Sequence, residues 1–161
     1  MAKTHAPPQD PNSRVVCRNR RANHEYELLQ QLECGVILVG SEVKSIRANK
    51  ISIEEAYVKV RDGAVWLINC DIAEYPQATY MNHDPRRPRQ LLLHRREVRK
   101  FAEAAADRGL TIIPLDVHIQ RGLVKLTIAV ARGRKLHDKR EKLKTKVDQK
   151  EMQQAVRRAV K

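Results

Sequence analysis

The sequence predicts a mainly β fold with short helices: a small antiparallel β-barrel, or curled sheet, with about three helices. Two segments carry this prediction, because residues 57–69 and residues 115–130 each alternate apolar and polar side chains around a two-residue turn. A third observation is that apolar residues at helical spacing are confined to short segments. With 161 residues, the chain is long enough for one domain and one hydrophobic core.

The first part of the chain has little to bury. Residues 1–14 are polar and proline-rich, so we expect them to be disordered, and they lack the apolar stretch of a secretion signal. A short helix is predicted over residues 24–32, "HEYELLQQL", with Tyr26, Leu29 and Leu32 as its apolar face.

A second helix is predicted within residues 40–50, "GSEVKSIRANK". Ser41 is a suitable N-cap, and Val43 and Ile46 then point inward.

The hairpin over residues 57–69 is the clearest local signal. Asp62-Gly63 suits a two-residue turn, because both positions tolerate positive φ. One face is then wholly apolar, while the other carries Tyr57, Lys59, Trp66 and Ile68. Such a strand pair indicates a barrel with something packed outside it, and Trp66 is expected in the core.

An arginine-rich segment separates this hairpin from the last predicted helix. Residues 83–98, "HDPRRPRQLLLHRREV", are expected to form a loop, either solvated or facing RNA, because they combine prolines with an arginine cluster. The helix follows over residues 96–109, with Gly109 at the position of a C-terminal cap. The second hairpin then turns at Arg121-Gly122.

The charge of the chain predicts a polyanionic partner. The net charge is +13, and residues 132–161 contain twelve basic and four acidic residues. A membrane is disfavoured, because no apolar run approaches the roughly 20 residues of a spanning helix. Aromatic residues make up only 4% of the chain, which favours a folded RNA, recognised by shape and phosphates, over a single strand.

The basic C-terminal tail, residues 134–161, has an interpretation of its own. It is rich in helix-forming residues, yet Lys139, Lys142 and Lys146 place like charges on one helical face. We therefore expect it to be disordered when free and helical when a partner supplies phosphates. A solvated tail that only aids solubility stays open as the alternative.

No catalytic, metal or cofactor site is predicted. "HEYEL" resembles the start of a zinc-protease motif, but Leu28 replaces the second histidine, and no histidine pair has ligand spacing. Cys17, Cys34 and Cys70 form no CxxC motif and are expected to be reduced thiols of a cytoplasmic protein. An enzyme is therefore not expected.

Four segments, in order, carry a specific resemblance: "NRRANHEYEL", "GSEVKSIRANK", "NHDPRRPRQLLLHRRE" and "GRKLHDKREKLK". From about Val15 to the C-terminus, the chain closely resembles the SmpB family of tmRNA-binding proteins. The resemblance implies an oligonucleotide-binding-type β-barrel with three α-helices over residues 15–133, followed by the basic tail. It also implies an adaptor of trans-translation, which binds the tRNA-like domain of tmRNA and brings it to stalled ribosomes.

The resemblance also implies two sets of site residues. The residues expected to bind tmRNA are Asn19, Arg20, Arg21, His24, Glu33, Lys44, Arg47, Leu92, His94 and Lys125. The residues expected to bind the ribosome, in the empty mRNA channel and decoding centre, are Gly133, Arg134, Lys135, His137, Asp138, Lys139, Arg140, Lys142, Lys144 and Lys146. Lysine and arginine suit phosphates, whereas His24 and Glu33 suit hydrogen bonds to sugar or base groups.

The implied partners are tmRNA, the ribosome with its 16S rRNA, and elongation factor Tu with the charged tmRNA. The chain itself is expected to be monomeric. A structural ribosomal protein, with its tail held permanently in rRNA, is the alternative from a different class, and an RNA-processing enzyme is the third.

Overall fold

The computed structural model describes residues 13–78 and 81–134. In chain order its elements are β1 (Ser13–Arg18), α1 (Ala22–Glu25), β2 (Tyr26–Val36), α2 (Gly40–Arg47), β3 (Ile51–Ser52), β4 (Tyr57–Arg61), β5 (Ala64–Ile68), β6 (Asp71–Ile72), the 3-10 turn η1 (Pro76–Ala78), β7 (Arg89–Leu92), α3 (Arg95–Ala106), β8 (Leu110–Gln120) and β9 (Leu123–Gly133).

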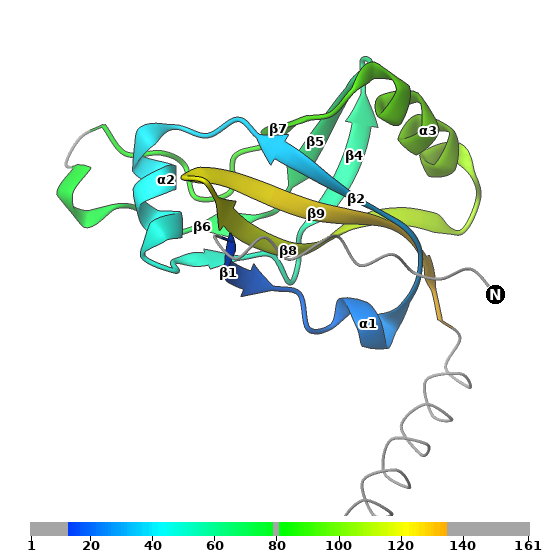
Figure 1. Cartoon of the computed structure of the whole chain (residues 1–161), viewed down its shortest axis with the longest axis horizontal. Helices are drawn as coiled ribbons and strands as arrows, with labels where there is room; N and C mark the ends of the chain where they lie inside the picture. Colours follow the sequence, from blue (N-terminus) through cyan, green and yellow to red (C-terminus); the bar gives the residue numbers. More distant parts are fainter. Residues whose placement is uncertain (1–12, 79–80, 135–161) are drawn as a thin grey trace, which may run out of the picture.

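Antiparallel pairing closes most of these strands into a barrel. The seven-stranded sheet has the order β1-β8-β4-β5-β7-β2-β9, and an additional pairing of β8 with β9 completes the ring. Figure 1 shows β2 and β9 running side by side along the barrel, with α2 at one end and α3 at the other. The predicted mainly β barrel with short helices is confirmed.

Both predicted hairpins are confirmed. Val58 pairs with Leu67 across β4 and β5, and the turn residues Asp62 and Gly63 have φ angles of 52° and 72°. The turn between β8 and β9 has the same form, with φ angles of 50° at Arg121 and 80° at Gly122. Local turn chemistry and period-two patterning were therefore sufficient to place these four strands.

The helix predicted over residues 24–32 is wrong. Helix α1 spans only Ala22–Glu25, and the chain then continues as the eleven-residue strand β2. Strand β2 pairs along its length with β9, with a bulge between Leu28 and Gln30. The bulge shifts the side-chain alternation by one residue, and pairing with β9 outweighs the modest helix propensity of glutamine, glutamate and leucine.

Helix α2 forms, but its cap differs from the prediction. It begins at Gly40, and the backbone amide of Val39 donates to the Glu42 carboxylate at 2.8 Å, so Ser41 is not the N-cap. The Ser41 hydroxyl instead contacts Nδ1 of His83 at 2.9 Å. Ile46 is buried, as predicted.

Helix α3 is confirmed over Arg95–Ala106. Phe101 of this helix lies in the core, with 1% of its surface exposed. Gly109 does not cap it, because Asp107 at the helix end is already extended. Gly109 has a φ of 86° and lies in the next turn, where the Leu110 amide donates to the Asp107 carbonyl at 3.3 Å. The positive φ of Gly109 therefore serves the turn between α3 and β8, and not the cap of the helix.

The arginine-rich segment is only partly a loop. Residues Arg89–Leu92 form β7, between β5 and β2, and Arg89 is fully buried. Arg87 and Arg89 both bond to Glu42 of α2, but only Arg89 is buried, because 31% of the Arg87 side chain is exposed. Arg86 lies at the surface, in an exposed ion pair with Asp71.

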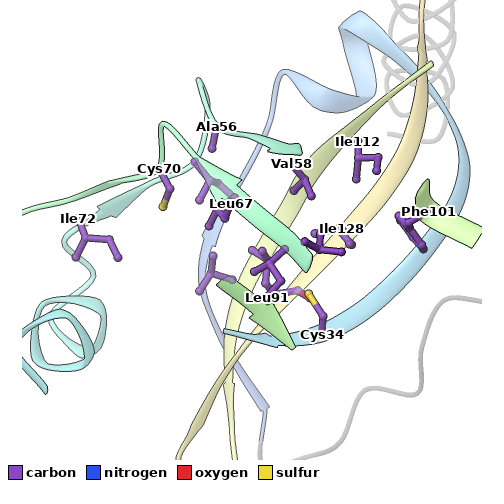
Figure 2. Packing of buried hydrophobic residues seen from close by; sticks show 14 of the residues in the cluster. Cys34, Ala56, Val58, Leu67, Cys70, Ile72, Leu91, Phe101, Ile112 and Ile128 are labelled. Atoms are coloured by element: carbon purple, nitrogen blue, oxygen red, sulfur yellow. The ribbon is translucent and has the colours of Figure 1, made fainter. Parts of the chain in front are cut away.

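The core fills the inside of the barrel. Figure 2 shows side chains such as Val58, Leu91 and Ile128 gathered in the space enclosed by the strands. The three cysteines are free thiols, as expected, and burial raises the pKa of Cys34 and of Cys70 to about 12. Both thiols are therefore neutral core groups.

The outside of the β4–β5 hairpin is partly covered. Helix α3 packs against β4 and β8, but Trp66, which was expected in the core, is half-buried and lines an open groove of about 620 Å³ with Lys59 and Ile68. No helix in residues 13–78 and 81–134 is both long and apolar enough to cross a membrane.

Candidate RNA-binding surface

The register of four strands places a row of residues across the barrel. Leu92 of β7 pairs with Gly35 of β2, which also pairs with Lys125 of β9. Lys125 pairs in turn with His118 of β8. These four residues are therefore neighbours although they come from distant parts of the sequence.

A second row lies two residues along the same strands. Glu33 of β2 pairs with Thr127 of β9, which pairs with Asp116 of β8. Because side chains alternate between the two faces of a strand, both rows point to the same, outer face of the sheet.

A shallow cavity of about 390 Å³ lies where this face meets the start of α3. It is lined by Glu33, Cys34, Gly35, Leu92, Leu93, His94, Glu97 and Lys125. Four of the residues expected to bind tmRNA, which are Glu33, Leu92, His94 and Lys125, thus meet in one place.

The apolar part of the cavity lies at Gly35, Leu92 and Leu93, beside charged side chains such as Glu33 and Lys125. Leu92 is 54% exposed and so offers an apolar contact surface. Gly35 has no side chain, and a Cβ atom there would contact Cβ of Leu92 at 3.4 Å. The glycine therefore keeps the floor open beside an apolar contact surface.

The carboxylate of Glu33 contacts two basic side chains. The ammonium of Lys125 donates to Oε1, and Nε2 of His118 lies 3.0 Å from Oε2. Partial burial by itself raises the pKa of Glu33, but the hydrogen bonds from Lys125 and His118 outweigh it and lower the pKa below its ordinary value. Glu33 is thus an ionised acceptor at neutral pH.

The start of α3 forms the far side of the cavity. The backbone amide of His94 donates to Oε2 of Glu97 at 2.8 Å, so Glu97 is used to cap the helix. The side chain of His94 is exposed at the rim.

A second group of expected residues surrounds α1. Arg20, Arg21 and His24 are exposed there, and Arg21 pairs with Glu55 at 2.9 Å and with Glu54 at 4.0 Å. These pairs are solvent-exposed and therefore weak.

Asn19 differs from these residues because it is largely buried. It is only 8% exposed, and its side chain bonds to the Pro114 carbonyl at 3.2 Å and to the Ala22 amide at 3.1 Å. These bonds anchor the chain before α1 to β8 and give the amide group a structural role, while its contact with tmRNA stays a prediction.

The two remaining expected residues lie on α2, at the opposite end of the barrel from α3 (Figure 1). Lys44 is exposed with its ammonium 5.1 Å from the ring centroid of Tyr75, and a guanidinium nitrogen of Arg47 lies 3.5 Å from the Gly122 carbonyl. The structure thus divides the expected tmRNA-binding residues among three places.

Sequence reasoning missed the groups behind the cavity. Gly35 was not predicted to take part, and Asp116, His118 and Thr127 were interpreted only as the polar faces of two strands. Their role appears only when β8, β9 and β2 are aligned, because a cross-strand register cannot be read from one strand alone.

The expected ribosome-binding residues are described only at their start. Gly133 pairs with Tyr26, and Arg134 donates from its amide to the Glu25 carbonyl at 2.9 Å and from Nε to the Tyr26 carbonyl at 2.8 Å. Arg134 is thus fastened to the barrel. The others, and the predicted change from disorder to helix in the tail, lie outside the described residues: Lys135, His137, Asp138, Lys139, Arg140, Lys142, Lys144 and Lys146. The disorder expected over residues 1–14 is wrong for Ser13 and Arg14, which begin strand β1, and for residues 1–12 it lies outside the described residues.

Across the part of the chain that the structure describes, no group of three or more histidine, cysteine, aspartate or glutamate side chains has a geometry that would hold a metal ion. The side chains that line the cavity offer hydrogen bonding, apolar contact and charge.

Comparison with known proteins identifies the family. The family model described as SmpB protein matches residues 16–158. The SsrA-binding protein of Rhodopirellula baltica is 50% identical over 149 residues, which cover 92% of this chain and 85% of that protein. The SsrA-binding protein of Nostoc punctiforme is 48% identical over 145 residues, covering 89% and 94% respectively.

A solved structure is also similar. A chain from "tmRNA-SmpB: a journey to the center of the bacterial ribosome" is 42% identical, with a TM-score of 0.65, and the match covers 76% of this chain and 85% of that one. The family model, the relatives and the barrel fold agree, and the chain belongs to the SmpB family.

Proposed function

We propose that this protein is an RNA-binding adaptor of trans-translation, which binds the tRNA-like domain of tmRNA and brings it to stalled ribosomes. One observation carries the proposal: in a chain of the SmpB family, Glu33, Leu92, His94 and Lys125 meet at one open cavity. The relatives are named for binding SsrA, and the similar solved structure is named for tmRNA, SmpB and the ribosome.

The cavity suits a folded RNA whose sugars and base edges are within reach. The Glu33 carboxylate accepts hydrogen bonds from a ribose 2′-hydroxyl or a base amino group. The ammonium of Lys125 has protons beyond its bond to Glu33 and donates them to a phosphate. Leu92 supplies an apolar contact to a ribose or base face.

Phosphate contacts on either side of the cavity complete the surface. Arg20, Arg21 and His24 supply them near α1, and Lys44 and Arg47 supply them on α2. RNA phosphates replace the carboxylate partners of Arg21 at little cost, because exposed ion pairs contribute about 0–1 kcal/mol.

The ribosome-binding half of the proposal falls to the basic tail. After Arg134 the tail enters the empty mRNA channel and the decoding centre, where its lysines and arginines meet rRNA phosphates. In this role the protein acts in the cytoplasm as a monomer, beside elongation factor Tu, and catalyses no reaction and holds no cofactor.

The test measures the affinity of the full chain for the tRNA-like domain of tmRNA. Leu92→Ala and Lys125→Ala are each expected to weaken binding about 10-fold, as loss of a central contact does. Lys59→Ala is the matched control, because Lys59 lies on the outer face of β4, on the other side of the ring from β2 and β9. Unchanged affinity in both cavity variants, or an equal loss in the control, would reject the assigned surface.

A further inference from the structure

His118 of β8 is buried directly behind the candidate RNA-binding cavity. Its side chain is 8% exposed. Nδ1 lies 2.9 Å from Oδ1 of Asp116, and Nε2 lies 3.0 Å from Oε2 of Glu33. Both ring nitrogens therefore face carboxylate oxygens.

This arrangement defines which form of the ring fits. Ionised carboxylates are acceptors only, and a neutral imidazole carries a single N–H group. Oδ1 of Asp116 already accepts from the Thr127 hydroxyl at 3.1 Å, and Glu33 is ionised because its pKa is lowered. Only the imidazolium form, with two N–H groups, donates to both carboxylates.

The charged groups around the ring are evenly matched. Asp116 on its own strand, Glu33 from β2 and Lys125 from β9 face it, and Arg18 of β1 pairs with Asp116 in register. Two acidic and two basic side chains therefore surround the ring, so the hydrogen-bond geometry, and not the charge count, selects the imidazolium form.

We propose that His118 is a positioning residue, whose imidazolium bridges Asp116 to Glu33 and so fixes the Glu33 carboxylate and the Lys125 ammonium for RNA. The Thr127 hydroxyl donates a hydrogen bond to Asp116, which restrains the carboxylate at that end of the bridge. A neutral ring keeps a single N–H, which donates either to Asp116 or to Glu33, so the bridge is broken in either tautomer and Glu33 is no longer tied through the ring to Asp116. This inference rests on the proposed function and makes RNA affinity dependent on pH.

The experiment measures binding of the tRNA-like domain of tmRNA by the full chain at constant ionic strength between about pH 5 and pH 8, where histidines change charge. Affinity of the unmodified chain is expected to fall about 10-fold toward the alkaline end, as loss of one charged hydrogen bond predicts. His118→Gln, which cannot gain a proton, is expected to bind weakly and with a smaller pH dependence than the unmodified chain.

The matched control is His83→Gln. His83 is also buried, and it bonds to Ser41 and to the Ile72 carbonyl, away from the cavity. It is expected to keep the pH profile of the unmodified chain. Thermal unfolding of both variants checks that each is folded over the same pH range.

A double-mutant cycle separates positioning from a general structural effect. If His118 acts through Glu33, His118→Gln costs almost no affinity when Glu33→Gln is already present. Additive losses in the cycle, or an unchanged pH dependence in His118→Gln, would overturn the inference while leaving the proposed function intact.

Nuclear magnetic resonance of the free protein tests the bridge without RNA. Two protected ring N–H signals of His118 are expected at the acid end of the range, with one of them lost in Glu33→Gln. If the chain fails to bind the RNA at every pH, the proposed function fails, and absence of the two ring signals would also reject the bridge.

Discussion

The carboxylate of Glu42 is fully buried and receives hydrogen bonds from three groups. Arg87 donates two bonds, at 2.8 and 2.6 Å, Arg89 donates one at 2.8 Å, and the Val39 amide donates one at 2.8 Å. Arg89 is itself fully buried and also donates to the Cys70 carbonyl at 2.7 Å. Glu42 therefore links α2 to β7 through Arg89, and to the segment that precedes β7 through Arg87.

Replacing Glu42 by glutamine should destabilise the protein strongly. Glu42→Gln leaves the Arg89 guanidinium buried without a counter-charge, a change that costs about 3–5 kcal/mol. Urea unfolding at neutral pH measures the loss. Asp71→Asn is the control, because it breaks an exposed pair with Arg86 and should cost less than about 1 kcal/mol.

The same residue gives the protein a sensitivity to acid. Burial by itself raises the pKa of Glu42, but the hydrogen bonds from Arg87 and Val39 and the charge of Arg89 lower it below the ordinary 4.5. The resulting stability is fully present above about pH 4.5 and is lost as the pH falls through the lower, folded-state pKa. The Glu42→Gln variant should lack this loss, and equal acid sensitivity of both proteins would argue against the assignment.

At the residue scale, the sequence could not distinguish Arg86 from Arg87 and Arg89. All three stand in one proline-rich run, which favoured a single surface cluster. The environments of Arg87 and Arg89 depend on Glu42, more than forty residues earlier in the chain. A charge is buried only when the fold brings a partner to it, and that partner is not visible locally.

At the element scale, the turn of the β8–β9 hairpin limits which residues it accepts. Gly122 has a φ of 80°, where a Cβ atom meets the preceding backbone, although the space around it is open. Gly122→Ala should therefore destabilise the fold by about 1–2 kcal/mol, measured by urea unfolding. Gly40→Ala at the first position of α2 is the control, since a Cβ atom added there would meet no atom within 4 Å and the φ of Gly40 is not positive. An equal effect at the two sites would contradict this explanation.

Strand β2 shows where element prediction failed. Its sequence has no strict alternation, because the bulge after Leu28 interrupts the period of two. A local pattern of leucines therefore resembled a helix face. The strand is stabilised by its pairing with β9, a long-range interaction that overrides weak local preference.

At the scale of the whole molecule, the barrel should bind tmRNA and the tail should act on the ribosome. A chain that ends at Arg134, with residues 135–161 deleted, should bind the tRNA-like domain with nearly unchanged affinity but should not support tagging on stalled ribosomes. Arg134 is retained because it bonds to Glu25 and Tyr26 of the barrel. If the barrel neutralises about five phosphates, its log–log salt slope should lie near −3.5 to −4.5.

The full-length chain serves as the reference for both measurements. A large loss of affinity in the shortened chain would place tmRNA binding in the tail. A flat salt response would mean that the basic surface of the barrel does not contact phosphates.

Local patterns along the chain were enough to predict the class of the fold, both hairpins with their turns, helix α3 and the motifs of the SmpB family. These features depend on local alternation, turn dihedral angles and residue identity, which are all readable along the chain. Only the tertiary structure decided that residues 26–36 form a strand, that Arg89 is buried and that Asn19 faces inward. It also decided that Glu33, Leu92, Lys125 and His118 share one face, because neighbours across a barrel are set by strand register between segments far apart in sequence.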